Sequence, residues 1–192
     1  MDAFVDSDWA GCRQSRRSTS GGLLAIGGSS LRSWSKTQPV IALSSGEADY
    51  HALVKGAVEA LGLQSLANDL GWCLDIRMWV DSAAAKSIAS RKGVGRVRHL
   101  EVRQLWLQEA VRLEKVTIKK IVGTYNPSDI LTKPKPKNEI ERLLKDVGGQ
   151  LLQRDSGSSS RTACGSNIDF VRQERPLSRA RGRGGCQHDA PT

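Results

Sequence analysis

The chain of 192 residues is long enough for one domain and a remainder. Hydrophobic residues make up 39% and charged residues 26%, and 29 Lys and Arg outnumber 20 Asp and Glu to give a formal net charge of +9. This composition allows one buried core and favours a polyanionic partner, nucleic acid before an anionic membrane surface. No apolar run approaches the roughly 18 residues of a membrane span, and the N-terminus lacks the basic-then-apolar order of a secretion signal. We therefore expect an intracellular protein, cytoplasmic or nuclear, that is not secreted and has no membrane partner.

Three short strands are predicted at the start of the chain. Residues 3–8 alternate in the manner of a strand, and residues 21–26 and 31–34 are short apolar stretches. The last two flank Gly27 and Gly28, a pair typical of a tight hairpin turn. We expect the second and third strands to pair through this turn.

A long helix with one apolar face is predicted next. Ser44 and Glu47 have the spacing of a capping box, which would begin the helix, and Gly71 is a typical end. Between these limits apolar residues recur at helical spacing, at Tyr50, Leu53, Val54, Ala57, Val58 and Leu61.

Shorter elements follow. Residues 76–80 read as a strand, Ser82 can cap a short helix that reaches Ala89, and residues 98–113 form a second long helix. Residues 116–122 alternate as a strand, and Pro127 lies at or near the first turn of a further helix. Together the elements predict a mixed α/β domain.

The composition changes near Gly148, which divides the chain into a domain over 1–150 and a tail over 151–192. The domain carries 22 basic and 16 acidic residues, and the tail carries 7 and 4. The tail is rich in Ser, Gly and Arg and has few large apolar residues, so we predict that it is disordered. Its arginines could hold RNA loosely; a merely solvated tail is an equal alternative.

Four acidic residues lie at the ends of predicted elements, where side chains converge: Asp6, Glu47, Asp81 and Asp129. Convergent carboxylates suit a hard divalent cation such as Mg²⁺. Two such ions about 4 Å apart can activate a water and stabilise the leaving oxygen of a phosphodiester. A basic chain that contains an acidic cluster fits this chemistry, because the basic surface would hold the backbone and the cluster would hold the metal.

Each acid also has a structural interpretation. Glu47 can complete the capping box, and Asp129 can favour the positive end of its helix. Asp81 can be a turn residue after a strand, and Asp6 an exposed charge on an edge strand. Spacing alone therefore leaves the metal site as the less favoured alternative.

Six short motifs follow one another along the chain. They are Val5-Asp6-Ser7-Asp8-Trp9-Ala10-Gly11 with Arg16-Arg17-Ser18-Thr19-Ser20-Gly21, Ser33-Trp34-Ser35-Lys36 with Gln38-Pro39, Ala42-Leu43-Ser44-Ser45-Gly46-Glu47-Ala48-Asp49-Tyr50, Val80-Asp81-Ser82-Ala83-Ala84-Ala85, Arg98-His99-Leu100-Glu101-Val102-Arg103, and Asn126-Pro127-Ser128-Asp129-Ile130-Leu131-Thr132-Lys133. In this order they resemble the ribonuclease H domain of Ty1/copia-type retrotransposon Pol polyproteins, and the resemblance covers roughly residues 2–148. It favours the metal site over the structural interpretation of the four acids.

The resemblance implies a ribonuclease H-like α/β fold, a five-stranded mixed sheet flanked by helices. It implies endonucleolytic hydrolysis of the RNA strand of an RNA–DNA hybrid, dependent on two Mg²⁺ ions for which Mn²⁺ can substitute. Asp6, Glu47, Asp81 and Asp129 would be the catalytic metal ligands, with Glu47 turned away from the capping box and towards the metal. Asp8 would have a lesser, orienting or structural role, and Gly46 departs from the residue usual before the Glu, which adds backbone freedom to the helix start. A reverse transcriptase domain, absent from this chain, is a further expected partner.

A hybrid would be held mainly through its phosphates and its 2′-hydroxyls. Two basic clusters are candidates, of which we expect the second to contribute more, and Ser45 could contact sugar or phosphate. The aromatic side chains are expected in the core, with Trp34 the candidate for base stacking because polar residues flank it. The clusters are Arg13, Arg16 and Arg17, and Arg91, Lys92, Arg96 and Arg98.

Three functions stay open from the sequence. The first is an active ribonuclease H, which the four acids favour. The second is a catalytically silent nucleic-acid-binding relic of a retrotransposon polyprotein, which the missing neighbouring domains and the unrelated tail favour. The third is an interaction module of a larger complex, which would not respond to added hybrid.

Overall fold

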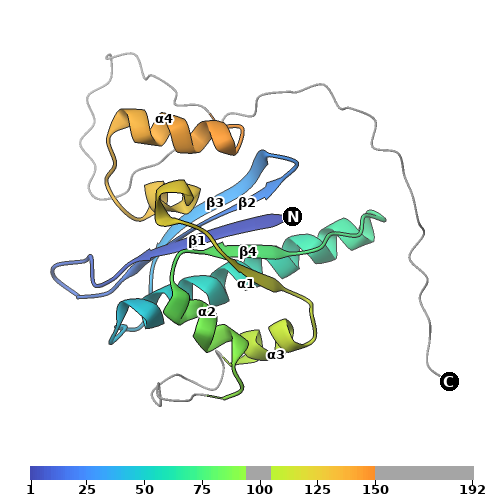
Figure 1. The fold of residues 1–192 in the computed structure, drawn as a ribbon, viewed down its shortest axis with the longest axis horizontal. Coiled ribbons are helices and arrows are strands. Elements are labelled where there is room, and N and C mark those ends of the chain that lie inside the picture. The colour runs from blue at the N-terminus through green and yellow to red at the C-terminus, as the bar shows by residue number, and fades with distance from the viewer. Residues whose placement is uncertain (94–104, 150–192) are drawn as a thin grey trace.

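The computed structural model describes residues 1–93 and 105–149, and in this part of the chain five strands form one mixed sheet (Figure 1). The sheet order is β3-β2-β1-β4-β5. The first three strands pair antiparallel, whereas β4 runs parallel to β1 and β5 parallel to β4. The strands are β1 (Asp2–Asp8), β2 (Thr19–Ile26), β3 (Ser29–Thr37), β4 (Arg77–Val80) and β5 (Thr117–Lys120).

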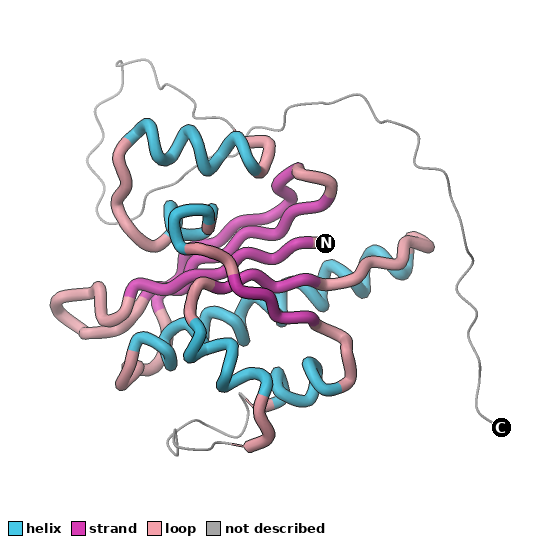
Figure 2. The backbone as a smooth tube through the Cα atoms, viewed as in Figure 1, coloured by secondary structure: helices cyan, strands magenta, loops and turns pink. Residues whose placement is uncertain are grey.

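Helices cover both faces of this sheet (Figure 2). The helices are α1 (Ser45–Asp69), α2 (Ala83–Ser90), α3 (Trp106–Arg112), α4 (Lys137–Asp146) and the short 3-10 helices η2 (Gly123–Tyr125) and η3 (Pro127–Leu131). The predicted five-stranded mixed sheet flanked by helices is therefore confirmed, and the fold is ribonuclease H-like. None of the helices in the described ranges is both long and apolar enough to cross a membrane.

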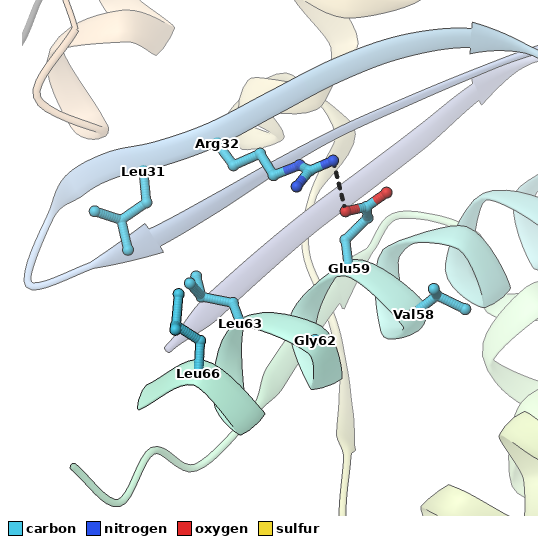
Figure 3. Close-up of a pocket in the computed structure, with 7 residues that line it drawn as sticks. All are labelled: Leu31, Arg32, Val58, Glu59, Gly62, Leu63 and Leu66. Carbon is cyan, nitrogen blue, oxygen red and sulfur yellow. Dashed lines mark ion pairs between the residues drawn. The ribbon is translucent and has the colours of Figure 1, made fainter. Parts of the chain in front are cut away.

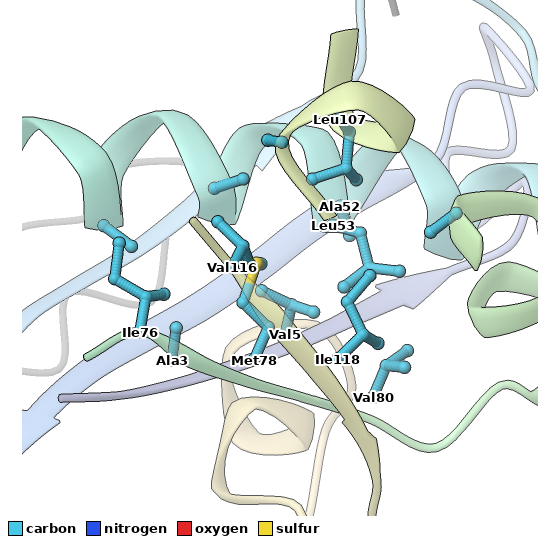
Figure 4. Packing of buried hydrophobic residues seen from close by; sticks show 14 of the residues in the cluster. Ala3, Val5, Ala52, Leu53, Ile76, Met78, Val80, Leu107, Val116 and Ile118 are labelled. Atoms are coloured by element: carbon cyan, nitrogen blue, oxygen red, sulfur yellow. The ribbon is translucent and has the colours of Figure 1, made fainter. Parts of the chain in front are cut away.

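The main core lies between the sheet and α1, α2 and α3 (Figure 4). Ala3 and Val5 of β1 point into it, whereas Phe4 packs with a smaller cluster on the other face, as strand alternation requires. Gly56 lets α1 approach closely, because a Cβ there would lie 2.5 Å from Val5 Cγ1 and 2.9 Å from Met78 Cε. The first strand, β1, is thus the central strand of the sheet and packs directly against α1.

The ends of α1 follow the sequence prediction. The Ser44 hydroxyl accepts a hydrogen bond from the Glu47 backbone N–H at 3.2 Å, and Gly71 ends the segment with φ +78°. Gly46 has a packing reason besides backbone freedom: it is buried, and a Cβ on it would lie 2.7 Å from the Ala84 Cβ. A glycine here lets the starts of α1 and α2 meet.

The hairpin between β2 and β3 also forms as predicted. Gly27 and Gly28 have φ +59° and +77°, the left-handed conformation of a tight turn. Trp34 of β3 lies over Gly22, whose missing Cβ would be 2.1 Å from the ring, and packs against the main core. Trp34 is thus half-buried against the core, in agreement with the expected core position, and its candidacy for base stacking stays a prediction.

The C-terminal part differs from the prediction in two ways. The helix expected at Pro127 is only the 3-10 helix η3, although Asn126 caps it and Pro127 takes its first turn. Beyond it the structure adds α4, whose Leu143 and Leu144 are buried against η3. Of the helix expected over residues 98–113, the described part is α3. The predicted tail and the segment 94–104 lie outside the described residues.

Candidate metal centre

Three aspartates converge at one end of the central strands. Asp6 of β1, Asp49 of α1 and Asp81 after β4 each offer a carboxylate oxygen, and these oxygens all lie within 4.8 Å of one another. The parallel pairing explains two of them: Phe4 lies opposite Trp79, so the same register continued by two residues brings Asp81 beside Asp6. The second turn of α1 supplies the third, Asp49.

Asp49 is fixed by a hydrogen bond from β1. The Ser7 hydroxyl donates to Asp49 Oδ1 at 2.6 Å. Burial raises the pKa of Asp49, and the nearby charge of Asp81 raises it further, while the hydrogen bonds from Ser7 and Ser82 oppose the rise. The carboxyl is thus held close to a second acid in a site with little solvent.

Asp6 is more strongly perturbed. It is 1% exposed, and burial raises its pKa to about 7 even though Thr132 and Lys133 stabilise its charged form. The Thr132 hydroxyl donates to Asp6 Oδ2, and Lys133 Nζ lies 3.1 Å from the same oxygen. The nearby charge of Asp129 raises the pKa of Asp6 as well.

Asp129 lies in η3 and forms ion pairs with two lysines. Lys133 Nζ is 2.7 Å from Asp129 Oδ1, and Lys135 Nζ is 3.0 Å from Asp129 Oδ2. Burial acts to raise the pKa of Asp129, but the hydrogen bonds from the two lysines outweigh it, so this pKa lies below its ordinary value. Burial opposes the charge of Lys133, yet its two carboxylate partners raise its pKa overall.

Glu47 is not part of the group of three aspartates. Its Oε2 accepts a hydrogen bond from the Leu43 N–H at 2.8 Å, and its Oε1 lies 3.6 Å from His51 Nε2. Its carboxylate reaches back to the backbone before α1, and the expectation that Glu47 turns towards a metal stays a prediction. The side chain two residues on, Asp49, takes the place beside Asp6.

The sequence held a signal for Asp49 that was missed. Asp49, Leu53, Gly56 and Ala60 follow one another at helical spacing, and the last three are buried. Gly56 contacts Val5 and Met78, so this stripe faces the central strands. An acid at the start of the stripe must point to the sheet end where Asp6 lies, whereas Glu47 is off this line.

The remaining predicted residues are distributed around this centre. Asp8 accepts a hydrogen bond from the Thr19 N–H and holds the turn after β1, which is a structural role. Ser45, the first residue of α1, is exposed, as are the three arginines of the β1–β2 loop at the same sheet end. Arg91 is half-buried and Lys92 exposed after α2, while two predicted residues lie outside the described part of the chain. The loop arginines are Arg13, Arg16 and Arg17, and the two outside are Arg96 and Arg98.

The donor set fits a divalent cation. Three carboxylate oxygens are the ligands that Mg²⁺ and Mn²⁺ prefer. Two of the carboxyls, Asp6 and Asp49, have a pKa raised by burial and by a neighbouring acid, which is the electrostatic condition that a bound cation relieves. Asp6, Asp49 and Asp81 can therefore hold one metal ion.

A separate surface hollow is not part of this site. It has a volume of about 510 Å³ and lies between β3 and the second half of α1 (Figure 3). Leu31, Leu63 and Leu66 supply apolar walls, and an ion pair of 2.9 Å joins Arg32 and Glu59 across it. None of the candidate metal ligands lines it.

The fold and the acidic group together define a ribonuclease H-like domain with a candidate metal centre at the carboxyl end of its central strands. Relatives of this chain include retrovirus-related Pol polyproteins of plant transposons, the kind of protein that its motifs resemble. The chain is similar to one segment of these polyproteins.

Two relatives and one solved structure illustrate the likeness. The Pol polyprotein of transposon TNT 1-94 from Nicotiana tabacum is 32% identical over 151 residues, which cover 78% of this chain and 11% of the relative. That of transposon RE1 from Arabidopsis thaliana is 23% identical over 151 residues, 77% of this chain and 10% of the relative. The chain thus spans about a tenth of these relatives' length.

The solved structure is the ribonuclease LC11-RNase H1 in complex with an RNA/DNA hybrid. It is 17% identical with a TM-score of 0.48, over 68% of this chain and 92% of that one. No protein-family model matches the chain.

Proposed function

We propose that this chain is a retrotransposon-derived ribonuclease H, which hydrolyses the RNA strand of RNA–DNA hybrids endonucleolytically with Mg²⁺. The observation that carries the proposal is the convergence of Asp6, Asp49 and Asp81 at one sheet end of a ribonuclease H-like fold. A net charge of +9 supports it, because a basic protein attracts the phosphate backbone to an otherwise acidic centre.

The side chains take distinct roles in this proposal. Asp6, Asp49 and Asp81 hold the cation, and Ser7 orients the Asp49 carboxylate through its hydrogen bond. When bound, the cation supplies Lewis-acid stabilisation of the scissile phosphate and lowers the pKa of the attacking water. Glu47 instead secures the start of α1, so Asp49 replaces it among the proposed ligands.

The nucleic acid is held by groups around this centre. Arg13, Arg16 and Arg17 lie exposed in the loop that directly follows β1, so they can reach phosphates of a hybrid whose RNA strand lies at Asp6. Ser45 at the start of α1 and the cluster of Arg91 and Lys92 are further proposed contacts. RNA binding by the tail and association with a reverse transcriptase remain proposals as well.

A catalytically silent nucleic-acid-binding relic is the second candidate function. The lysines at Asp129 favour it: Lys133 bridges Asp6 and Asp129, and Lys135 pairs with Asp129 as well. The two lysines supply counter-charges to these acids without any metal. Such a protein would bind hybrids through its basic surface and leave them intact.

Cleavage of an end-labelled RNA–DNA hybrid by purified protein in Mg²⁺ separates the two. We expect cutting of the RNA strand that chelator abolishes and that Asp81→Asn and Asp49→Asn reduce by at least about 100-fold, since each removes a metal ligand. Glu47→Gln is the matched control two residues away, because Gln keeps an oxygen acceptor for the Leu43 N–H. It should retain cleavage within about threefold.

Binding of hybrid without cutting, by folded protein in both Mg²⁺ and Mn²⁺, would establish the relic instead. Loss of cutting in Glu47→Gln together with full activity of Asp49→Asn would return Glu47 to the ligand set and contradict the assignment made from the geometry.

A further inference from the structure

Lys133 occupies the space between two of the acids that a two-ion site would use. Its Nζ lies 3.1 Å from Asp6 Oδ2, 3.3 Å from Asp6 Oδ1 and 2.7 Å from Asp129 Oδ1. One ammonium group therefore contacts both carboxylates at hydrogen-bond distance. The other oxygen of Asp129 is engaged by Lys135 at 3.0 Å.

This lysine is held in place by the backbone of η3. The Lys133 N–H donates to the Asp129 carbonyl at 3.0 Å, and the preceding Thr132 bonds Asp6 through its hydroxyl. The 3-10 helix is itself tied to β1, because the buried Asn126 donates from Nδ2 to the Val5 carbonyl at 2.9 Å. The residues after η3 thus place the Lys133 ammonium beside Asp6 of β1.

We propose that the Lys133 ammonium serves as a built-in second cation of this site, so that the protein binds one divalent ion, at Asp6, Asp49 and Asp81, where the resemblance implies two. The catalytic meaning of this inference rests on the proposed function, whereas the number of bound ions does not. Lys133 is a positioning residue here: it neutralises Asp6 and Asp129.

Electrostatics explains why the two cations exclude each other. A divalent ion between Asp6 and Asp129 would have to displace an ammonium that makes charge-assisted hydrogen bonds to two buried carboxylates. It would also lie near the ion of the three aspartates, because the two ions would share Asp6, and the two divalent charges would repel each other. The ammonium carries a single charge and is covalently tethered, so a second divalent ion has to compete with it for this place.

The test counts the ions bound to metal-free full-length protein, by titration with Mn²⁺ and electron paramagnetic resonance of the free ion. We expect one Mn²⁺ in the wild type and a second in Lys133→Met, bound at least about tenfold more tightly than any second ion in the wild type. Lys133→Arg should keep one. Lys135→Met is the matched control, because it also removes a cation from Asp129 but leaves the one that contacts Asp6; it should keep one as well.

Two equally tight Mn²⁺ ions in the wild type would overturn the inference, as would a single ion in folded Lys133→Met. Should that variant fail to fold by circular dichroism, Asp129→Asn decides. The inference expects this variant to bind its one Mn²⁺ within about threefold of the wild type, because Asp129 is not a ligand. Loss of the ion from Asp129→Asn, to the extent seen with Asp49→Asn, would contradict it.

Hybrid cleavage measured on the same samples separates this inference from the proposed function. One ion in the wild type and two in Lys133→Met, with no cutting by the wild type, would remove the nuclease and leave the inference intact. Cutting by a wild type that binds two ions would support the proposed function and overturn the inference.

Discussion

The carboxyl of Asp6 is buried and also lies beside Lys133. Burial raises its pKa by more than the lysine lowers it. Its pKa of about 7 in the metal-free fold lies above the ordinary value of 3.8. Between these two values the folded state keeps a proton that the unfolded chain has released. The contribution of Asp6 to the free energy of unfolding is therefore fully present below about pH 4. It falls as the pH rises and is lost above about pH 7.

Asp6→Asn tests this ionisation in chelator, by thermal or denaturant unfolding from pH 5 to pH 8. The wild type should lose stability relative to the variant as the pH rises, with a slope of at most about 1.4 kcal/mol per pH unit, because one proton is involved. Any hydrogen bond lost in the variant adds a constant offset that does not change with pH. A difference between the two proteins that is the same at every pH would contradict the raised pKa.

Ionisation of Asp6 should also make metal affinity depend on pH, and this affinity should rise with pH where the stability of the metal-free protein falls. A proton on Asp6 competes with the cation, so Mn²⁺ affinity should increase as the pH rises towards about 7 and then level off. The acid that destabilises the metal-free protein at neutral pH is thus the one that the ion stabilises.

At the scale of elements, α1 sets the distance between the helix layer and the sheet. Gly56 lies where the helix crosses Val5 and Met78, and Gly62, two turns further on, faces open space. The two glycines therefore separate packing from helix propensity within one helix. The acid Asp49 shares the Gly56 face, so any change in this approach also moves a proposed metal ligand.

Gly56→Ala should destabilise the protein by about 1–3 kcal/mol, because overpacking against Val5 exceeds the gain in helix propensity. Gly62→Ala should instead stabilise it by about 0.5–1 kcal/mol, since it adds propensity and meets no neighbour. Urea unfolding of both variants measures the difference. Equal stabilisation in the two would show that the helix can move away from the sheet at little cost.

The elements that the sequence predicted share a local cause. Gly27 and Gly28 dictate the hairpin, and Ser44 and Ser82 begin α1 and α2, because turn and cap chemistry acts within a few residues. Helix α4 was missed because Pro134 and Pro136 precede it and suggest an irregular segment, whereas its stability comes from burying Leu143 and Leu144 against η3.

The site was predictable only in part for the same reason. Asp6 and Asp81 end strands, so their convergence follows from parallel pairing. Which acid of α1 joins them depends on the rotation of the helix against the sheet, and matching motif letters does not determine this. The place of Lys133 depends on the tie between Asn126 and Val5, a contact between residues far apart in the sequence.

At the scale of the whole molecule, the placement of positive charge matters more than its total. Arg13, Arg16 and Arg17 lie exposed at the sheet end that carries the three aspartates. Arg77 begins β4 at the opposite end, and like Arg32 and Arg112 it is paired with an acid. Two sets of three arginines therefore carry the same charge in different places, one set free to meet phosphates and one already paired.

Replacing each set with alanine lowers the net charge from +9 to +6 and distinguishes placement from total. The measurement is the affinity for an RNA–DNA hybrid, by fluorescence anisotropy with Asp81→Asn as the background in both sets, across a series of salt concentrations. Loss of Arg13, Arg16 and Arg17 should reduce the slope of log affinity against log salt by up to about 3, because each phosphate contact contributes nearly one released counterion. Loss of Arg32, Arg77 and Arg112 should leave the slope almost unchanged, since no phosphate contact is removed and the freed acids lie far from the hybrid. Equal reductions would show that the molecule attracts nucleic acid by its overall charge alone, and the hybrid would then have no defined path past Asp6.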